Sequence, residues 1–195
     1  MIYTTQINGL QLKTGDILCN TDGKPDILPG EFWRLLGRIL PGDVDHIAIY
    51  LGPGGRCIEA GAIGVITFEV ENGIWDAEKM MQSRGMLVDT LYGVVSPLTG
   101  LGLPAEEEDK IREDIAAYCL AQVGKPYNLN VFDPEIETAF YCSQLAYKAY
   151  IRHGINLNAD MRVEVLPGTE KIVYPQEIWQ HGGNQRRFGA SPESA

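Results

Sequence analysis

The sequence lacks several features that would assign it to common classes of protein. None of its 4 cysteines belongs to a Cys-x-x-Cys pair or to a cluster with histidine, so a structural zinc site is not expected. It has no block of basic residues, and 26 acidic against 16 basic side chains give a net charge of −10. We therefore expect neither nucleic acid nor an anionic membrane surface as a partner. No apolar run is long enough for an integral membrane segment.

The first residues also lack the pattern of a secretory signal. Met1-Ile2-Tyr3-Thr4-Thr5-Gln6 has neither a basic start nor an apolar run. We therefore expect a cytoplasmic protein. An exported or periplasmic protein is the alternative if a leader has been removed from the chain. The sequence says nothing about the oligomeric state.

The composition that remains is that of a folded protein. The chain has 195 residues, of which 45% are hydrophobic, enough for one domain with a real core. There is no internal repeat and no linker rich in serine, proline and glycine. We expect a single domain over residues 1–188, followed by a flexible tail over residues 189–195, whose side chains are small and polar.

Hydrophobic periodicity predicts strands first and helices afterwards. This order favours an α+β fold in which helices pack against a central, mostly antiparallel sheet. The expected strands are Asp16–Cys19, His46–Leu51, Arg56–Ala60, Val65–Val70 and Met86–Leu91. The expected helices are Glu31–Ile39, Ala105–Val123 and Cys142–His153, with a last short helix after Pro175.

The most regular of these patterns is a hairpin, and its loop predicts its register. A loop of the four residues from Gly52 to Gly55 pairs Leu51 with Arg56 and Tyr50 with Cys57. A shorter loop would mix polar and apolar side chains on each face, so the four-residue loop is the more consistent interpretation.

In that register His46 and Glu59 are diagonal neighbours on one face. Their Cβ atoms are then roughly 7 Å apart, which two extended side chains bridge. A histidine beside a carboxylate has a fixed tautomer and a stabilised imidazolium. The alternative is a half-exposed strand face on which both side chains simply meet water.

Cys142 is the best candidate for a nucleophile among the cysteines. It stands in the first turn of a predicted helix, where unpaired amide groups and the helix dipole favour a thiolate. The alternative is one more core residue, because it shares the helical spacing of Leu145 and Ala149. The remaining cysteines are expected to be packing residues, namely Cys19, Cys57 and Cys119.

Short motifs follow one another in a definite order along the chain. They are Leu12-x-x-Gly15-Asp16-Ile17-Leu18, then Asp45-His46-Ile47-Ala48-Ile49-Tyr50-Leu51-Gly52, then Ile58-Glu59-Ala60 with Gly64-Val65, and finally Gly124-x-Pro126-Tyr127 before Phe140-Tyr141-Cys142-Ser143-Gln144-Leu145. In content and order they resemble the circularly permuted NlpC-type cysteine peptidases. These form the YaeF/YiiX-like branch of the papain-like superfamily, which is related more distantly to the lecithin:retinol acyltransferase family. The resemblance extends from about Leu12 to the region of Pro175.

The resemblance implies a role for each candidate residue. Cys142 would be the nucleophile, His46 the general base and Glu59 the residue that orients the histidine, with no metal and no organic cofactor. The backbone amide of Cys142 would supply part of an oxyanion hole. Aromatic side chains expected to contact the substrate are Tyr127, Tyr141 and Tyr50.

The chain departs from the family pattern at two places. Gln144 stands where many relatives carry glutamate, and the segment from Thr21 to Val44 has no counterpart. We interpret that segment as a lid or wall particular to this protein. Both departures bear on the substrate more than on the mechanism.

The expected function is hydrolysis of an amide bond in a small peptide, of the cell-wall type or related, through a thioester. One alternative is a lipid amide or ester hydrolase, or an acyltransferase of the lecithin:retinol acyltransferase type. A second is a binding module that keeps the fold without the chemistry. Loss of Cys142, His46 or Glu59 would favour that last reading, and all are present.

Overall fold

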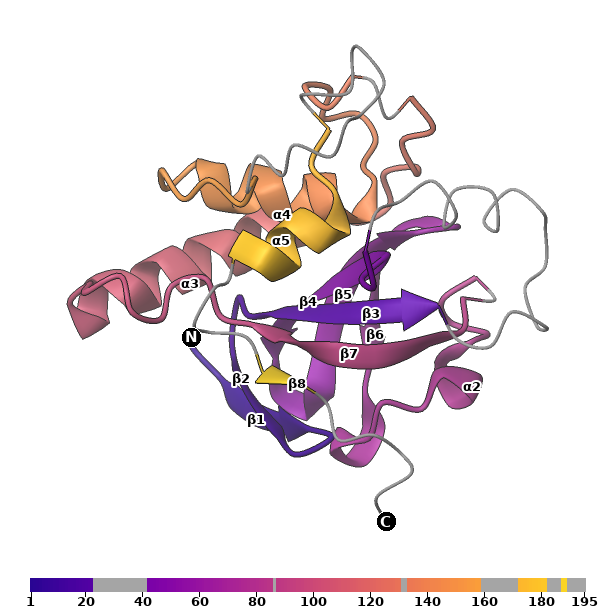
Figure 1. Ribbon diagram of the computed structural model, residues 1–195, viewed down its shortest axis with the longest axis horizontal. Coiled ribbons are helices and arrows are strands. Elements are labelled where there is room, and N and C mark those ends of the chain that lie inside the picture. Colours follow the sequence, from indigo (N-terminus) through magenta and orange to yellow (C-terminus); the bar gives the residue numbers. More distant parts are fainter. Residues whose placement is uncertain (23–41, 86, 131–132, 159–171, 182–186, 189–195) are drawn as a thin grey trace.

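A six-stranded antiparallel sheet forms the centre of the fold (Figure 1). The computed structural model describes residues 1–22, 42–85, 87–130, 133–158, 172–181 and 187–188. The strands are β1 (Thr4–Ile7), β2 (Leu10–Lys13), β3 (Ile17–Asp22), β4 (His46–Gly52), β5 (Arg56–Gly61), β6 (Gly64–Glu69), β7 (Asp89–Val95) and β8 (Arg187–Phe188). The sheet runs β6-β5-β4-β3-β7-β8, and β1 and β2 form a separate hairpin. The helices are α2 (Ala77–Met80), α3 (Ala105–Leu120), α4 (Cys142–Ile151) and α5 (Pro175–His181). The fold is α+β, as the sequence predicts.

The sheet separates two apolar layers (Figure 1). On one face it packs against α3, α4 and α5, and on the other against the β1–β2 hairpin and the segment around Trp75. Alternation along β4 serves both layers, because Ile47 and Ile49 face the helices while Ala48 and Tyr50 face the hairpin side. Both faces of β4 are therefore buried, and its polar residue His46 lies at the strand's first position.

The predicted hairpin is present, with one correction to its register. Tyr50 pairs with Cys57 as predicted, but the pairing of Leu51 with Arg56 is wrong, because Gly52 takes that place. The register shifts between Tyr50 and Gly52, where a β-bulge inserts one extra residue before the turn. The shift comes after the residues that matter for the site, so the face shared by His46 and Glu59 is unaffected.

Other predicted elements differ mainly at their ends, which depend on local capping. The helix α3 ends at Leu120 and α4 at Ile151, while β3 and β7 begin and end later than expected. The short elements β1, β2, α2 and β8 are not predicted at all. The expected helix Glu31–Ile39, most of the segment Thr21–Val44 and the tail over residues 189–195 lie outside the described residues.

One glycine fixes how the end of α3 meets the sheet. Gly64 has a φ of +96°, and a Cβ atom there would lie 2.4 Å from the carbonyl oxygen of Lys125. The N–H of Val65 donates to that oxygen at 2.8 Å, and its own carbonyl accepts from Gly124 at 2.9 Å. The start of β6 thereby holds the chain just before Tyr127.

Within the described ranges, no helix combines the length and the apolar character needed to cross a bilayer.

Candidate active site

Cys142 is the first residue of α4 and packs against the sheet. Its side chain is buried, at 7% exposure, in the apolar cluster on the helical face. The face predicted for this helix is buried throughout, and consists of Cys142, Leu145, Ala146, Ala149 and Tyr150. The next residue, Ser143, donates its hydroxyl to the carbonyl of Val173 at 2.7 Å. The start of α4 is therefore held by the packing of Cys142 and by the hydrogen bond of Ser143.

Gln144 joins the start of α4 to the chain that precedes it. Its Oε1 accepts from the backbone N–H of Tyr141 at 3.2 Å and from the side-chain amide of Asn128 at 3.1 Å. Its Nε2 donates to the carbonyls of Pro134 and Ile136 at 2.9 and 2.8 Å. A glutamate would have no hydrogen to donate to those carbonyls. The departure from the family pattern at this position thus has a local structural reason.

His46 and Glu59 are joined as their register predicts. The Nε2 atom of His46 lies 2.8 Å from Oε2 of Glu59, and the side chains are 12% and 0% exposed. The alternative of a solvated strand face is therefore wrong for this pair. Since Nε2 is engaged by Glu59, the ring nitrogen left for another partner is Nδ1.

The imidazole of His46 also meets the thiol of Cys142. Burial disfavours the imidazolium, but the hydrogen bond and charge interaction with Cys142, together with those to Glu59, raise the pKa of His46 well above its ordinary value. His46 opens β4 at the end of the sheet, which explains how its ring reaches a cysteine that packs with Ile47 on the helical face. The structure brings these three predicted residues together.

Glu59 has a further partner that the sequence analysis missed. Arg84, in the turn after α2, donates to both carboxylate oxygens and is itself fully buried. Burial alone would raise the pKa of Glu59, but Arg84 and His46 lower it below its ordinary value. Asp89 binds the other edge of the guanidinium. No spacing rule links residues of a turn and of β7 to a carboxylate on β5, so no sequence signal was available.

The three tyrosines named as substrate contacts fall into two groups. Tyr127 and Tyr141 lie near the site, since burial raises the pKa of each phenol and the neighbouring Cys142 contributes to both shifts. Tyr50 is 1% exposed in the apolar layer on the opposite face, where burial and Cys57 raise its pKa to about 12. Tyr50 therefore offers almost no surface to a substrate.

The remaining cysteines are buried packing residues, as expected. All of the cysteines are free thiols, and Cys19, Cys57 and Cys119 have no exposed surface. Burial raises the pKa of all three, that of Cys119 to about 12. Among the side chains that the structure describes, Cys142 is the cysteine that has a histidine partner.

A solved structure has a similar fold. It is described as the metalloprotein yiiX from Escherichia coli O157:H7, DUF1105, and the two chains share 16% identity with a TM-score of 0.54 over 91% of this chain and 96% of that one. In the part of this chain that the structure describes, no group of three or more His, Cys, Asp or Glu side chains is placed to hold a metal ion.

Comparison with models of protein families assigns this chain to a family. No curated protein matches this chain. The model of the permuted papain-like amidase family, YaeF/YiiX, C92, matches residues 11–182, which is most of the sequence. The resemblance read from the motifs is thereby confirmed, and the chain belongs to the C92 family of permuted papain-like amidases, a family of cysteine hydrolases that act on amide bonds.

Proposed function

We propose that this protein hydrolyses an amide bond in a small peptide through a thioester on Cys142. In this proposal His46 is the general base and then the general acid, and Glu59 orients the imidazole and stabilises its cation. The proposal adds the residues, the intermediate and the substrate class to the membership of an amidase family.

The observation that carries the proposal is the position of His46 between two partners. Its ring meets the carboxylate of Glu59 at 2.8 Å on one side and the thiol of Cys142 on the other, in a site with little exposure to water. A neutral imidazole accepts the thiol proton at Nδ1 while Nε2–H donates to the carboxylate. The raised pKa of His46 favours the resulting imidazolium.

The reaction then has two halves. The Sγ atom of Cys142 attacks the carbonyl carbon, the C–N bond breaks, and His46 gives its proton to the departing amine. Water next attacks the thioester, His46 removes one of its protons, and the C–S bond breaks to release the acid and restore the thiol. The proton that leaves with the amine in the first half is replaced by one from water in the second, so the enzyme is restored and no reactant other than water is needed.

The start of α4 supplies the groups that would stabilise the oxyanion. The backbone N–H of Cys142 belongs to the first turn of α4, where amides have no acceptor within the helix. The hydrogen bonds of Ser143 and Gln144 hold this turn in place. Of the two tyrosines near the site, the half-buried Tyr127 is proposed to contact the substrate, whereas Tyr141, at 4% exposure, offers nearly as little surface as Tyr50.

An activity assay with both kinds of compound distinguishes a peptide substrate from a lipid substrate. We expect turnover of short peptides with γ-linked or D-residue-containing bonds, and none of long-chain acyl amides or esters. Turnover of the lipid substrates alone would favour the acyltransferase-like alternative.

Replacing the nucleophile tests the chemistry directly. Cys142→Ala should abolish hydrolysis of any active peptide, and Cys119→Ala, which alters a thiol in the same apolar cluster, should not. Iodoacetamide at mildly acidic pH should label Cys142 much faster than the three buried thiols, because a thiolate paired with His46 reacts there. Full activity of Cys142→Ala, or equal labelling of all four cysteines, would contradict the proposal and favour a binding module.

A further inference from the structure

The carboxylate that holds His46 is itself held by a buried arginine. Oε2 of Glu59 lies 2.8 Å from Nε2 of His46 and 2.7 Å from Nη2 of Arg84, so one oxygen serves both cations. Nε of Arg84 adds contacts of 3.0 Å to Oε1 and 3.1 Å to Oε2. The guanidinium therefore determines where that oxygen stands relative to the imidazole.

The guanidinium is in turn fixed on its other edge and on its faces. Asp89 accepts from Nη1 at 2.7 Å and from Nη2 at 2.8 Å, a two-point contact that sets the plane of the group. The rings of Phe68 and Trp75 lie 4.6 and 4.9 Å from its central carbon. Trp75 also donates its indole N–H to Asp89 at 3.2 Å. These contacts hold Arg84 against Glu59.

The result is a buried row of charges that alternate in sign. It runs from Asp89 on β7 to Arg84 after α2, then to Glu59 on β5 and His46 on β4, and ends at Cys142 at the start of α4. Asp89 and Arg84 cancel each other's charge, so their direct effect on the imidazolium is small. What they provide is an ionised Glu59 in one position.

We propose that Arg84, backed by Asp89, is a positioning residue for the proposed catalytic histidine, keeping the Glu59 carboxylate charged and aimed at His46 Nε2. The inference rests on the proposed function, because it assigns Arg84 a part in forming the thiolate–imidazolium pair. Buried ion pairs elsewhere are often only structural, so the test must separate catalysis from folding.

The sign of the expected effect follows from the groups around Glu59. Those that face it are His46 from β4, Arg84 with Asp89 behind it, and Cys57 on the same strand. Without Arg84, burial is opposed by His46 alone and the pKa of Glu59 rises. A protonated Glu59 no longer stabilises the imidazolium, so the reactive pair should form only at higher pH.

The experiment measures the alkylation of Cys142 by iodoacetamide as a function of pH, read by mass spectrometry of its peptide. The variant is Arg84→Met combined with Asp89→Asn, which removes both charges of that pair and leaves Glu59 with His46 as its charged partner. The matched control is Arg112→Met with Asp16→Asn, a second buried arginine–aspartate pair that contacts none of the site residues. Thermal unfolding verifies that each variant is folded.

We expect Cys142 of the site variant to be alkylated about tenfold more slowly at mildly acidic pH, with its curve of rate against pH displaced to higher pH. The control should stay within about twofold of the wild type, since surface and remote changes leave such a curve in place. A curve for the folded site variant that is unchanged, or that moves to lower pH, overturns the inference.

A second variant covers the case in which the double change does not fold. Arg84→Lys keeps the charge but loses the forked geometry, so its curve should move in the same direction by a smaller amount; an unmoved curve also overturns the inference. Failure of the proposed function itself looks different, because wild-type Cys142 would then react no faster than the buried thiols.

Discussion

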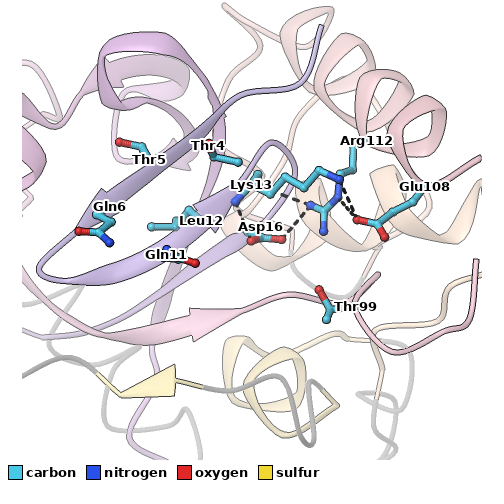
Figure 2. A pocket seen from close by; sticks show the side chains of 10 residues that line it. All are labelled: Thr4, Thr5, Gln6, Gln11, Leu12, Lys13, Asp16, Thr99, Glu108 and Arg112. Atoms are coloured by element: carbon cyan, nitrogen blue, oxygen red, sulfur yellow. Dashed lines mark hydrogen bonds and ion pairs between the residues drawn. The ribbon is translucent and has the colours of Figure 1, made fainter. Parts of the chain in front are cut away.

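Two buried arginines, Arg84 and Arg112, each join separate elements of the fold through ion pairs, but their partners differ. Arg84 is 0% exposed and Arg112 is 1% exposed, and each binds two acidic side chains. Figure 2 shows the second of them, where Arg112 reaches from α3 to Asp16 with Glu108 beside it. Arg112 also donates to the carbonyl of Thr14 at 2.7 Å. These contacts attach α3 to the chain at the start of β3.

The two carboxylates respond in opposite directions. At Asp16 burial outweighs Arg112, and the pKa of the carboxyl is raised. At Glu59 the guanidinium of Arg84 and the imidazole of His46 together outweigh burial, and the pKa is lowered. The difference is that Glu59 has two cationic partners, whereas Asp16 has one, which it shares with Glu108 and with backbone carbonyls.

Solvent also reaches the two networks differently. A cavity of about 470 Å³ opens beside Arg112 and is lined by Asp16, Glu108 and the β1–β2 hairpin (Figure 2). The side chain of Glu108 is accordingly 21% exposed, while Asp89 beside Arg84 is 1% exposed. Asp16 immediately precedes β3, whereas Asn20, the strand residue that pairs with His46, lies about 13 Å farther along the chain. The same pairing of charges is structural at one end of the strand and is proposed to support chemistry at the other.

The largest contrast should come from neutralising each carboxylate. Glu59→Gln should slow hydrolysis of any peptide that the wild type cleaves by about 100-fold or more, because the imidazolium loses its anionic partner. Asp16→Asn should leave that rate within about twofold, since Asp16 does not touch the proposed site. Steady-state kinetics on both variants measure the difference.

Stability serves as the control for this pair of variants. Glu59→Gln leaves Arg84 with one buried anion fewer, at a cost of about 3–5 kcal/mol, so folding must be verified by circular dichroism before rates are compared. Equal losses of rate in two folded variants would show that Glu59 has no special part in the reaction.

The pH dependence of stability should have opposite signs for the two acids. Because the pKa of Glu59 is lowered from 4.5, its contribution is present above that value and is lost as the pH falls through the folded pKa. Because the pKa of Asp16 is raised from 3.8, its charged form is penalised, and stability declines as the pH rises from that value through the folded pKa. Urea unfolding of the wild type, Glu59→Gln and Asp16→Asn across this range isolates each slope. Slopes of one sign would contradict the comparison.

The smallest effect should come from the outer acid of the Arg112 network. Glu108→Gln should cost about 1 kcal/mol or less, because water replaces part of what the carboxylate provides, and the loss should shrink at high salt. Asp89→Asn, at the matching place beside Arg84, should cost more, because the arginine is left with an unpaired edge in a buried site. Urea unfolding at low and high salt compares them, and equal costs would mean that exposure does not distinguish the two networks.

Much of the site could be read from the sequence because its parts are local patterns. The strand pairing that places His46 beside Glu59 follows from alternation and a short loop, and Cys142 is marked by its place at a helix start. The bulge at Leu51 could not be predicted, because the sequence of the turn does not distinguish pairing of Arg56 with Leu51 from pairing with Gly52. The burial of Tyr50 could not be predicted for a related reason: alternation places it on the same face as His46, but whether that face is open or packed depends on what covers it.

By itself the sequence determined the α+β class, the order of the histidine and cysteine segments and the membership of the permuted amidase family, because these are properties of spacing and order along the chain. Only the tertiary structure decided that Arg84 and Asp89 lie behind Glu59, that Gln144 anchors the start of α4, and that Arg112 has different partners from Arg84. The physical reason is that the pKa and the effect of a buried charged group depend on the partners that desolvate and neutralise it. Those partners come from separate elements, and no local pattern in the sequence records their meeting.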